Sequence, residues 1–117
     1  MTDQTIYHIC RRDEWALAQA AGSYAGSSQD HADGFIHFSA TDQVVTSAAK
    51  HRAGQSDLVL IAVDVAALGS VLRWEASRGG ALFPHLYGPL PMTAVRWATP
   101  LPLGADGQHV FPPLDGI

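Results

Sequence analysis

Runs of apolar residues separated by small polar stretches divide the chain into short segments. Residues 58–63, Leu-Val-Leu-Ile-Ala-Val, form an unbroken apolar run between Asp57 and Asp64. A run of this length, rich in β-branched residues, is typical of a strand buried on both faces. Shorter runs of mixed or alternating character predict further strands at residues 5–10, 35–39, 71–75 and 93–99.

Two segments carry apolar residues at the spacing of an α-helix. The first covers residues 13–21, with Asp13 as the expected N-cap and Gly22 as the stop. The second begins at a capping-box pattern formed by Ser39 and Asp42 and ends near residue 54. The apolar stripe expected for the first helix contains Trp15, Leu17, Ala18, Ala20 and Ala21.

Two polar or proline-rich stretches connect these elements. Residues 23–34 are small and polar, so we expect a loop in which Tyr24, Asp30, His31 and Asp33 face solvent, with contact to a ligand as the alternative. Glycine and proline punctuate residues 71–91, and this excludes regular helix or central strand over much of that stretch. The chain as a whole predicts one α+β domain, residues 1–117, with about five or six short strands and two helices. Pro100 and Pro102 are expected to stop the last strand.

Composition and charge narrow the class of protein. The 117 residues are 47% hydrophobic and 15% charged, which are ordinary globular values. The net charge is −4 and no basic run exceeds Arg11-Arg12, so we expect no extensive nucleic-acid surface. Cys10 is the only cysteine, which excludes an internal disulfide and favours packing over a nucleophilic role. A signal peptide and a bilayer-spanning apolar run are both missing, so we expect a cytoplasmic protein with no membrane association.

Sequence motifs for common catalytic and cofactor sites are absent. There is no Walker A sequence, Rossmann glycine fingerprint, CxxC pair, HExxH or GxSxG. Three histidines and a carboxylate would suffice for zinc, but no pair has local ligand spacing, so we expect no metal and keep a His-based site as an alternative. The helix that follows Ser39 offers amides suited to phosphate or carboxylate. The remaining candidates are His8, His37, Ser39, Arg73, Glu75, His85 and Tyr87.

Four motifs carry a resemblance to a known family. They are Tyr7-His8, Asp33-Gly-Phe-Ile-His-Phe-Ser39, Trp74-Glu75 and Phe83-Pro-His-Leu-Tyr-Gly-Pro-Leu90. With these motifs the chain resembles the bacterial family called domain of unknown function 952, from about residue 5 to about residue 99. That resemblance supplies no activity.

Two of the motifs carry a more distant likeness to proteins of the ADP-ribosyltransferase fold. Tyr7-His8 resembles the Tyr-His opening of that fold, and Ile36-His-Phe-Ser39 is similar to a strand end in its RNA 2′-phosphotransferase branch. The likeness implies a small split β-sheet whose cleft binds NAD, ADP-ribose or another phosphorylated nucleoside. It also implies a transferase acting on such a ligand.

The same likeness implies roles for single residues. His8 would contact ribose, His37 and Ser39 phosphate or ribose, and Tyr87 the nicotinamide ring. Apart from the likeness, the positive charge of Arg73 suits phosphate. Glu75, His37 and His85 are the catalytic candidates. Protein-modifying members commonly place a catalytic glutamate near residues 87–95, but no acidic residue stands between Arg78 and Asp106 here. The alternative is a non-catalytic module that binds a small ligand or a protein.

Overall fold

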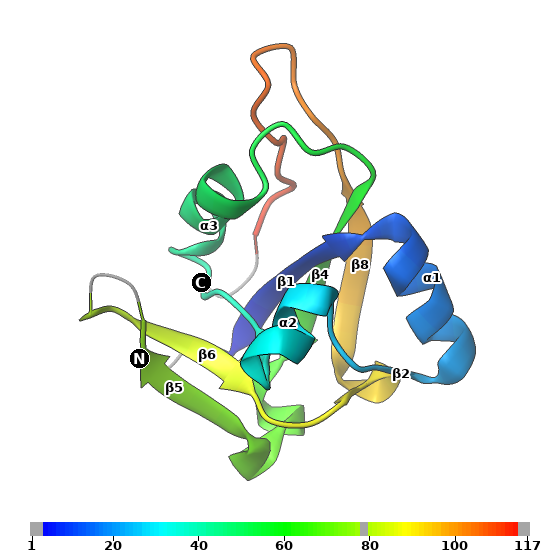
Figure 1. Cartoon of the computed structure of the whole chain (residues 1–117), viewed down its shortest axis with the longest axis vertical. Helices are drawn as coiled ribbons and strands as arrows, with labels where there is room; N and C mark the ends of the chain where they lie inside the picture. The colour runs from blue at the N-terminus through cyan, green and yellow to red at the C-terminus, as the bar shows by residue number, and fades with distance from the viewer. Residues whose placement is uncertain (1–3, 78–79, 115–117) are drawn as a thin grey trace.

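A computed structural model describes residues 4–77 and 80–114, so Arg78 lies outside the described part of the chain. It confirms the α+β class, with more elements than expected (Figure 1). The helices are α1 (Arg12–Ala21), α2 (Ser28–Asp33) and α3 (Val44–His51). The strands are β1 (Thr5–Arg11), β2 (Ser23–Tyr24), β3 (Ile36–His37), β4 (Leu58–Asp64), β5 (Leu72–Ala76), β6 (Leu82–Leu86), β7 (Leu90–Pro91) and β8 (Val95–Leu101).

The strands form three small antiparallel sheets. Their orders are β1-β4-β8, β3-β6-β5 and β2-β7. The first two sheets meet where Tyr7 and Ser39 exchange two backbone hydrogen bonds of 2.8 Å each. Residues 36–39 therefore pair with β6 at one end and with β1 at the other. This places His37 and Ser39 at the junction of the two sheets.

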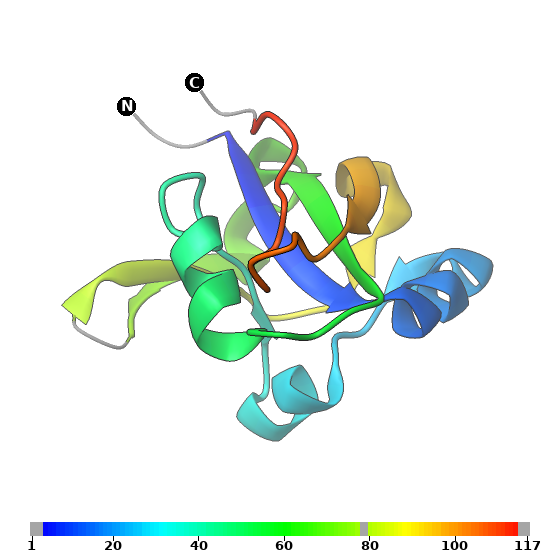
Figure 2. The ribbon, with the colours of Figure 1, turned by 90° about the horizontal axis from the view of Figure 1, so that it is seen from above.

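Strand β4 is buried on both faces, as its apolar run predicts. Its alternate residues Val59, Ile61 and Val63 belong to a core cluster that includes Trp15 of α1. Leu58, Leu60 and Ala62 belong to a second cluster, with Tyr7, Val44 and Leu101. Helices α1 and α3 accordingly lie on opposite sides of β1 and β4 (Figures 1 and 2). Among the described helices, none combines the length and the apolar character that crossing a membrane requires.

Helix α1 ends as expected but begins one residue early. Gly22 adopts a left-handed φ of 87° and its amide donates to Ala18, which confirms the predicted stop. The N-cap is Arg11 and not Asp13, whose Oδ1 accepts the neighbouring Glu14 amide at 2.8 Å. Leu17 is 73% exposed, so its assignment to the apolar stripe is wrong. The buried stripe of this ten-residue helix is narrow and consists of Trp15 and Ala18.

Residues 23–34 are structured, contrary to the expected loop. Ser27 caps α2, because its Oγ accepts the Asp30 amide at 3.3 Å while Asp30 Oδ2 accepts the Ser27 amide at 2.7 Å. Tyr24 and Asp30 are only 2% and 3% exposed, so the expectation that they face solvent is wrong. Asp33 and His31 are exposed, as predicted. A capped helix of six residues has too few turns to show apolar periodicity.

Helix α3 begins later than its predicted capping box. Ser39 is engaged with Tyr7, and its hydroxyl donates to Ser47 at 3.0 Å, so it is not the N-cap. Gln43 holds that position, with its side-chain oxygen accepting the Ala40 amide at 2.9 Å. The helix ends at His51, before the expected residue 54. The Val44 amide, which opens α3, already donates to the Ala40 carbonyl at 3.0 Å.

Three prolines lie inside strands, against expectation, and one of them, Pro91, belongs to the two-residue strand β7. Pro84 sits in β6, the central strand of its sheet, and its carbonyl accepts the Phe38 amide at 3.0 Å. In an antiparallel pair the nitrogen and the carbonyl of one residue face the same neighbouring strand. The Pro84 nitrogen, which has no hydrogen to donate, therefore faces Phe38, just beyond the end of β3. Pro100 lies in β8, an edge strand, where proline is tolerated.

Candidate functional site

The β3-β6-β5 sheet gathers most of the predicted site residues on one face. His37 and Arg73 both pair with His85 in the strand register, and Glu75 pairs with Phe83. Cross-strand partners share a face, so these side chains project together. The Phe35 ring stacks on His85 with centroids 4.0 Å apart and lies 4.6 Å from the ring of His37. The sheet thus brings residues from three strands into one row of rings and charges.

The imidazole of His37 lies between two carboxylates. Its Nδ1 is 2.6 Å from Asp30 Oδ1, and its Nε2 is 2.9 Å from Asp33 Oδ2. Ionised carboxylates only accept hydrogen bonds, so both ring nitrogens carry protons and the ring is an imidazolium. The hydrogen bond from Asp30 is the main cause that raises the pKa of His37 above its ordinary value of 6.5. His37 therefore places a fixed positive charge at the sheet junction.

Asp30 is the buried anchor of this arrangement. Its two oxygens accept the Ser27 amide and hydroxyl and both the amide and the ring of His37. Burial alone would raise the pKa of Asp30, but the hydrogen bonds from His37 and Ser27 hold it well below its usual range. Sequence reasoning missed Asp30, although the Ser27–Asp30 spacing is a capping-box signal.

His8 is satisfied entirely by the protein. Its Nδ1 lies 2.5 Å from the His37 carbonyl, so it donates, and its Nε2 accepts from the Tyr24 hydroxyl at 2.8 Å. Burial is the largest cause that lowers the pKa of His8, so the ring is neutral. His8 is only 4% exposed, and its hydrogen bonds link β1 to His37 of β3 and to Tyr24 of β2. In this arrangement its position supports His37, and any contact with ribose would require Tyr24 to give up its hydrogen bond.

The pKa values of His37 and His8 are shifted in opposite directions from the ordinary value. We expect NMR of the imidazole nitrogens to show His37 protonated above pH 6.5 and His8 neutral below it, as their shifted pKa values require. Because the folded-state pKa of His37 is raised, its contribution to stability is complete below pH 6.5 and disappears as the pH rises through the folded value. The difference in unfolding free energy between the wild type and His37→Ala should shrink accordingly. A difference that grows with pH would contradict the assignment.

A second cluster lies beside the first on β5 and β6. Glu75 Oε1 accepts from the Tyr87 hydroxyl at 2.6 Å and from His85 Nδ1 at 2.9 Å. The Tyr87 bond, followed by the His85 bond, lowers the pKa of the Glu75 carboxyl. The guanidinium of Arg73 lies over the Tyr87 ring, 5.1 Å from its centroid. Glu75 thus fixes the orientation of both a histidine and a tyrosine.

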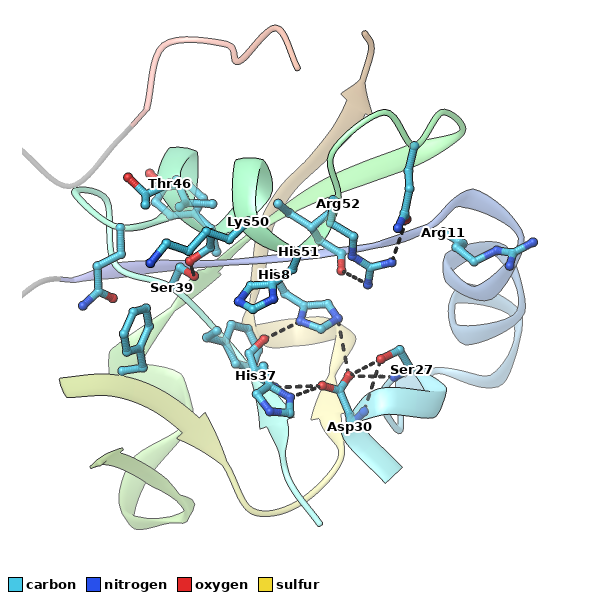
Figure 3. A pocket seen from close by; sticks show the side chains of 18 of the residues that line it. His8, Arg11, Ser27, Asp30, His37, Ser39, Thr46, Lys50, His51 and Arg52 are labelled. Atoms are coloured by element: carbon cyan, nitrogen blue, oxygen red, sulfur yellow. Dashed lines mark hydrogen bonds and ion pairs between the residues drawn. The ribbon is translucent and has the colours of Figure 1, made fainter. Parts of the chain in front are cut away.

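An open groove of about 1780 Å³ runs past the first cluster (Figure 3). Four of the predicted site residues line it, namely His8, His37, Ser39 and His85. Of the described residues, Arg73, Glu75 and Tyr87 are not among those that line the groove. Its opposite wall comes from α3, where Ser47 and Lys50 face the groove, and sequence reasoning did not identify them.

Two other expectations concern cysteine and metal. Cys10 is fully buried, and burial raises the pKa of its thiol to about 12, which confirms that it is a packing residue. Within residues 4–77 and 80–114, no three His, Cys, Asp or Glu side chains are grouped so that they could hold a metal ion.

Comparison with known proteins places the chain in a family. The model of the family described as "Protein of unknown function (DUF952)" matches residues 9–98. The chain belongs to this family. A crystal structure of the Caulobacter crescentus protein CC0527 is 52% identical, with a TM-score of 0.87 over 91% of this chain and 93% of that one. A solution NMR structure of CC0527 is 53% identical, with a TM-score of 0.80 over 89% and 90%. No curated protein matches the chain.

Proposed function

We propose that this DUF952 protein binds a phosphorylated nucleoside, such as NAD or ADP-ribose, in the groove. One observation carries the proposal: aromatic and histidine rings face the hydroxyl and lysine wall of α3 across the same open space. The ring of Phe35, which stacks on the buried His85, presents a flat surface of the kind on which a base or nicotinamide ring packs. Ser47 and Lys50 present the donors that phosphate requires.

The proposed activity is that of a small transferase with an ADP-ribosyltransferase-like fold. The arrangement of two sheets, β1-β4-β8 and β3-β6-β5, that meet at Tyr7 and Ser39 supports this part of the proposal. His37, His85 and Glu75 are the residues that would carry proton transfer or orient a ribose hydroxyl. Protein ADP-ribosylation is disfavoured, because no acidic residue stands between Arg78 and Asp106.

The alternative is a binding module without catalysis. The internal hydrogen bonds of His8 and the double engagement of Glu75 favour it, because both groups already have protein partners. The proposed partner is a small nucleotide-like ligand in the cytoplasm, whereas the binding module would take a small ligand or a protein. A nucleic-acid polymer and a membrane are not proposed, since the chain has a net charge of −4.

Binding and transfer are separated by two measurements. We expect ADP-ribose or NAD to bind with micromolar to millimolar affinity in calorimetry, and to raise the melting temperature by several degrees. A ligand at 100 times its Kd adds about 2.7 kcal/mol to the unfolding free energy. Labelled NAD should leave little or no label on protein. Brisk labelling abolished by Glu75→Gln would contradict this expectation.

His37→Ala should weaken binding, whereas Leu17→Ala, on the exposed face of α1, should not. Arg73→Ala serves as a comparison, because Arg73 lies beside the groove, and its replacement weakens binding only if the ligand extends to Tyr87. If NAD, ADP-ribose and common nucleotides all fail to bind at millimolar concentration, the proposal is wrong.

A further inference from the structure

The carboxylate of Asp33 stands at the wall of the groove. It is the last residue of α2, it is 41% exposed, and it lines the groove together with His37. Its Oδ2 is held 2.9 Å from His37 Nε2, and His37 is held in turn by the buried Asp30. Asp30 is fixed by Ser27. A chain of hydrogen bonds that begins in the core therefore positions this exposed carboxylate.

The charge balance around His37 decides what Asp33 can bind. One imidazolium stands between two carboxylates, so the group carries one net negative charge. A phosphate placed there would meet excess negative charge, and like charges at close range are repulsive. Hydroxyl groups, by contrast, donate to carboxylate oxygens. A vicinal diol, as in ribose, is the chemical group that fits this end of the groove.

The opposite end of the groove has the complementary chemistry. Lys50, the only lysine in the chain, is exposed and lines the groove on the last turn of α3. The hydroxyls of Ser39 and Ser47 are 3.0 Å apart on the same side. Arg52 is committed to the Ile9 carbonyl at 3.0 Å. Figure 3 shows Lys50 and Ser39 in one part of the pocket and His37 with Asp30 in another.

Glu75 is poorly placed to be the carboxylate that meets the ligand. Its Oε1 already accepts from Tyr87 and His85, and Glu75 is not among the described residues that line the groove. Of the carboxylates and cations that line the groove, Asp33 is the exposed carboxylate held beside His37, and Lys50 stands on the same helix as Ser47.

We propose that the groove binds a nucleoside diphosphate in one orientation, with the ribose diol on Asp33 and the phosphates on Lys50. This inference rests on the proposed function. It adds the carboxylate that binds the ribose, the cation that binds the phosphates, and the orientation of the ligand in the groove. It makes Asp33 the residue that distinguishes ribose from deoxyribose. Lys50 becomes the residue that distinguishes a nucleotide from a nucleoside.

Calorimetry with ADP, 2′-deoxy-ADP and adenosine tests both roles. For the wild type we expect ADP to bind at least tenfold more tightly than either of the other two, since each comparison removes a hydrogen bond to a charged group. Asp33→Asn should bring the ratio of the ADP and 2′-deoxy-ADP affinities close to one while leaving the ratio of ADP to adenosine intact. Lys50→Ala should produce the reverse pattern.

Asp64→Asn is the matched control. Asp64 is 37% exposed and pairs with Arg96 at 3.4 Å, away from the groove, so both ratios should stay at their wild-type values. A ribose preference that survives Asp33→Asn but is lost in Glu75→Gln would overturn the assignment while leaving nucleotide binding standing. Equal affinities of ADP and 2′-deoxy-ADP for the wild type would overturn it as well. Failure of ADP, NAD and ADP-ribose alike would remove the proposed function too.

Discussion

Leu60→Ala should lower the free energy of unfolding by about 2–5 kcal/mol, as large-to-small changes in packed cores do. Leu60 is fully buried in β4, the central strand of its sheet, and packs in the cluster that includes Tyr7 and Val44. Neighbours fixed in two other elements have little freedom to fill the space that the leucine leaves. Urea denaturation of the wild type and the variant measures the difference.

Leu17→Ala is the matched control for this substitution, because it deletes the same atoms from a leucine that is 73% exposed. We expect it to change the unfolding free energy by no more than about 0.5 kcal/mol. Comparable losses for the two variants would mean that α1 packs through Leu17 after all. A small loss for Leu60→Ala alone would mean that β4 is not the centre of the core.

The elements that local sequence specifies strongly were predicted correctly. The apolar run of β4 is long enough to identify a strand buried on both faces, and Gly22 ends α1 because its left-handed conformation suits glycine. The pairing of His85 with His37 and Arg73 was not predicted, because residues 82–86 were expected in a loop and are in fact strand β6.

Features that depend on distant partners could not be predicted from local patterns. Asp30 is buried because His37 and His8 pack against it, and both lie outside its helix. Pro84 fits a central strand only because β3 ends beside it. Val44 and Ala48 are buried in the core, so the opposite face of α3, which carries Lys50, is turned to the groove. Each case is decided by which elements become neighbours.

The burial of Asp30 makes it the polar residue whose loss should cost most. We expect Asp30→Ala to lower the free energy of unfolding by about 3–5 kcal/mol, the range found when one member of a buried ionic network is removed. The Ser27 amide, the His37 amide and the His37 ring would all lose their acceptor at the sheet junction. Chemical denaturation near neutral pH, where the carboxylate is ionised, measures the loss.

Asp33→Asn is the control that tests whether any carboxylate beside His37 stabilises the fold as much as the buried Asp30 does. Asp33 contacts the same ring from the solvent side, and exposed ion pairs contribute only about 0–1 kcal/mol. Asp30→Ala should also lower the pKa of His37, because the hydrogen bond that chiefly raises it is gone. It should weaken nucleotide binding as well, since Asp33 is oriented through His37. If the two variants were equally stable, Asp30 would be a peripheral residue and the chain of contacts from Ser27 to Asp33 would not position the groove.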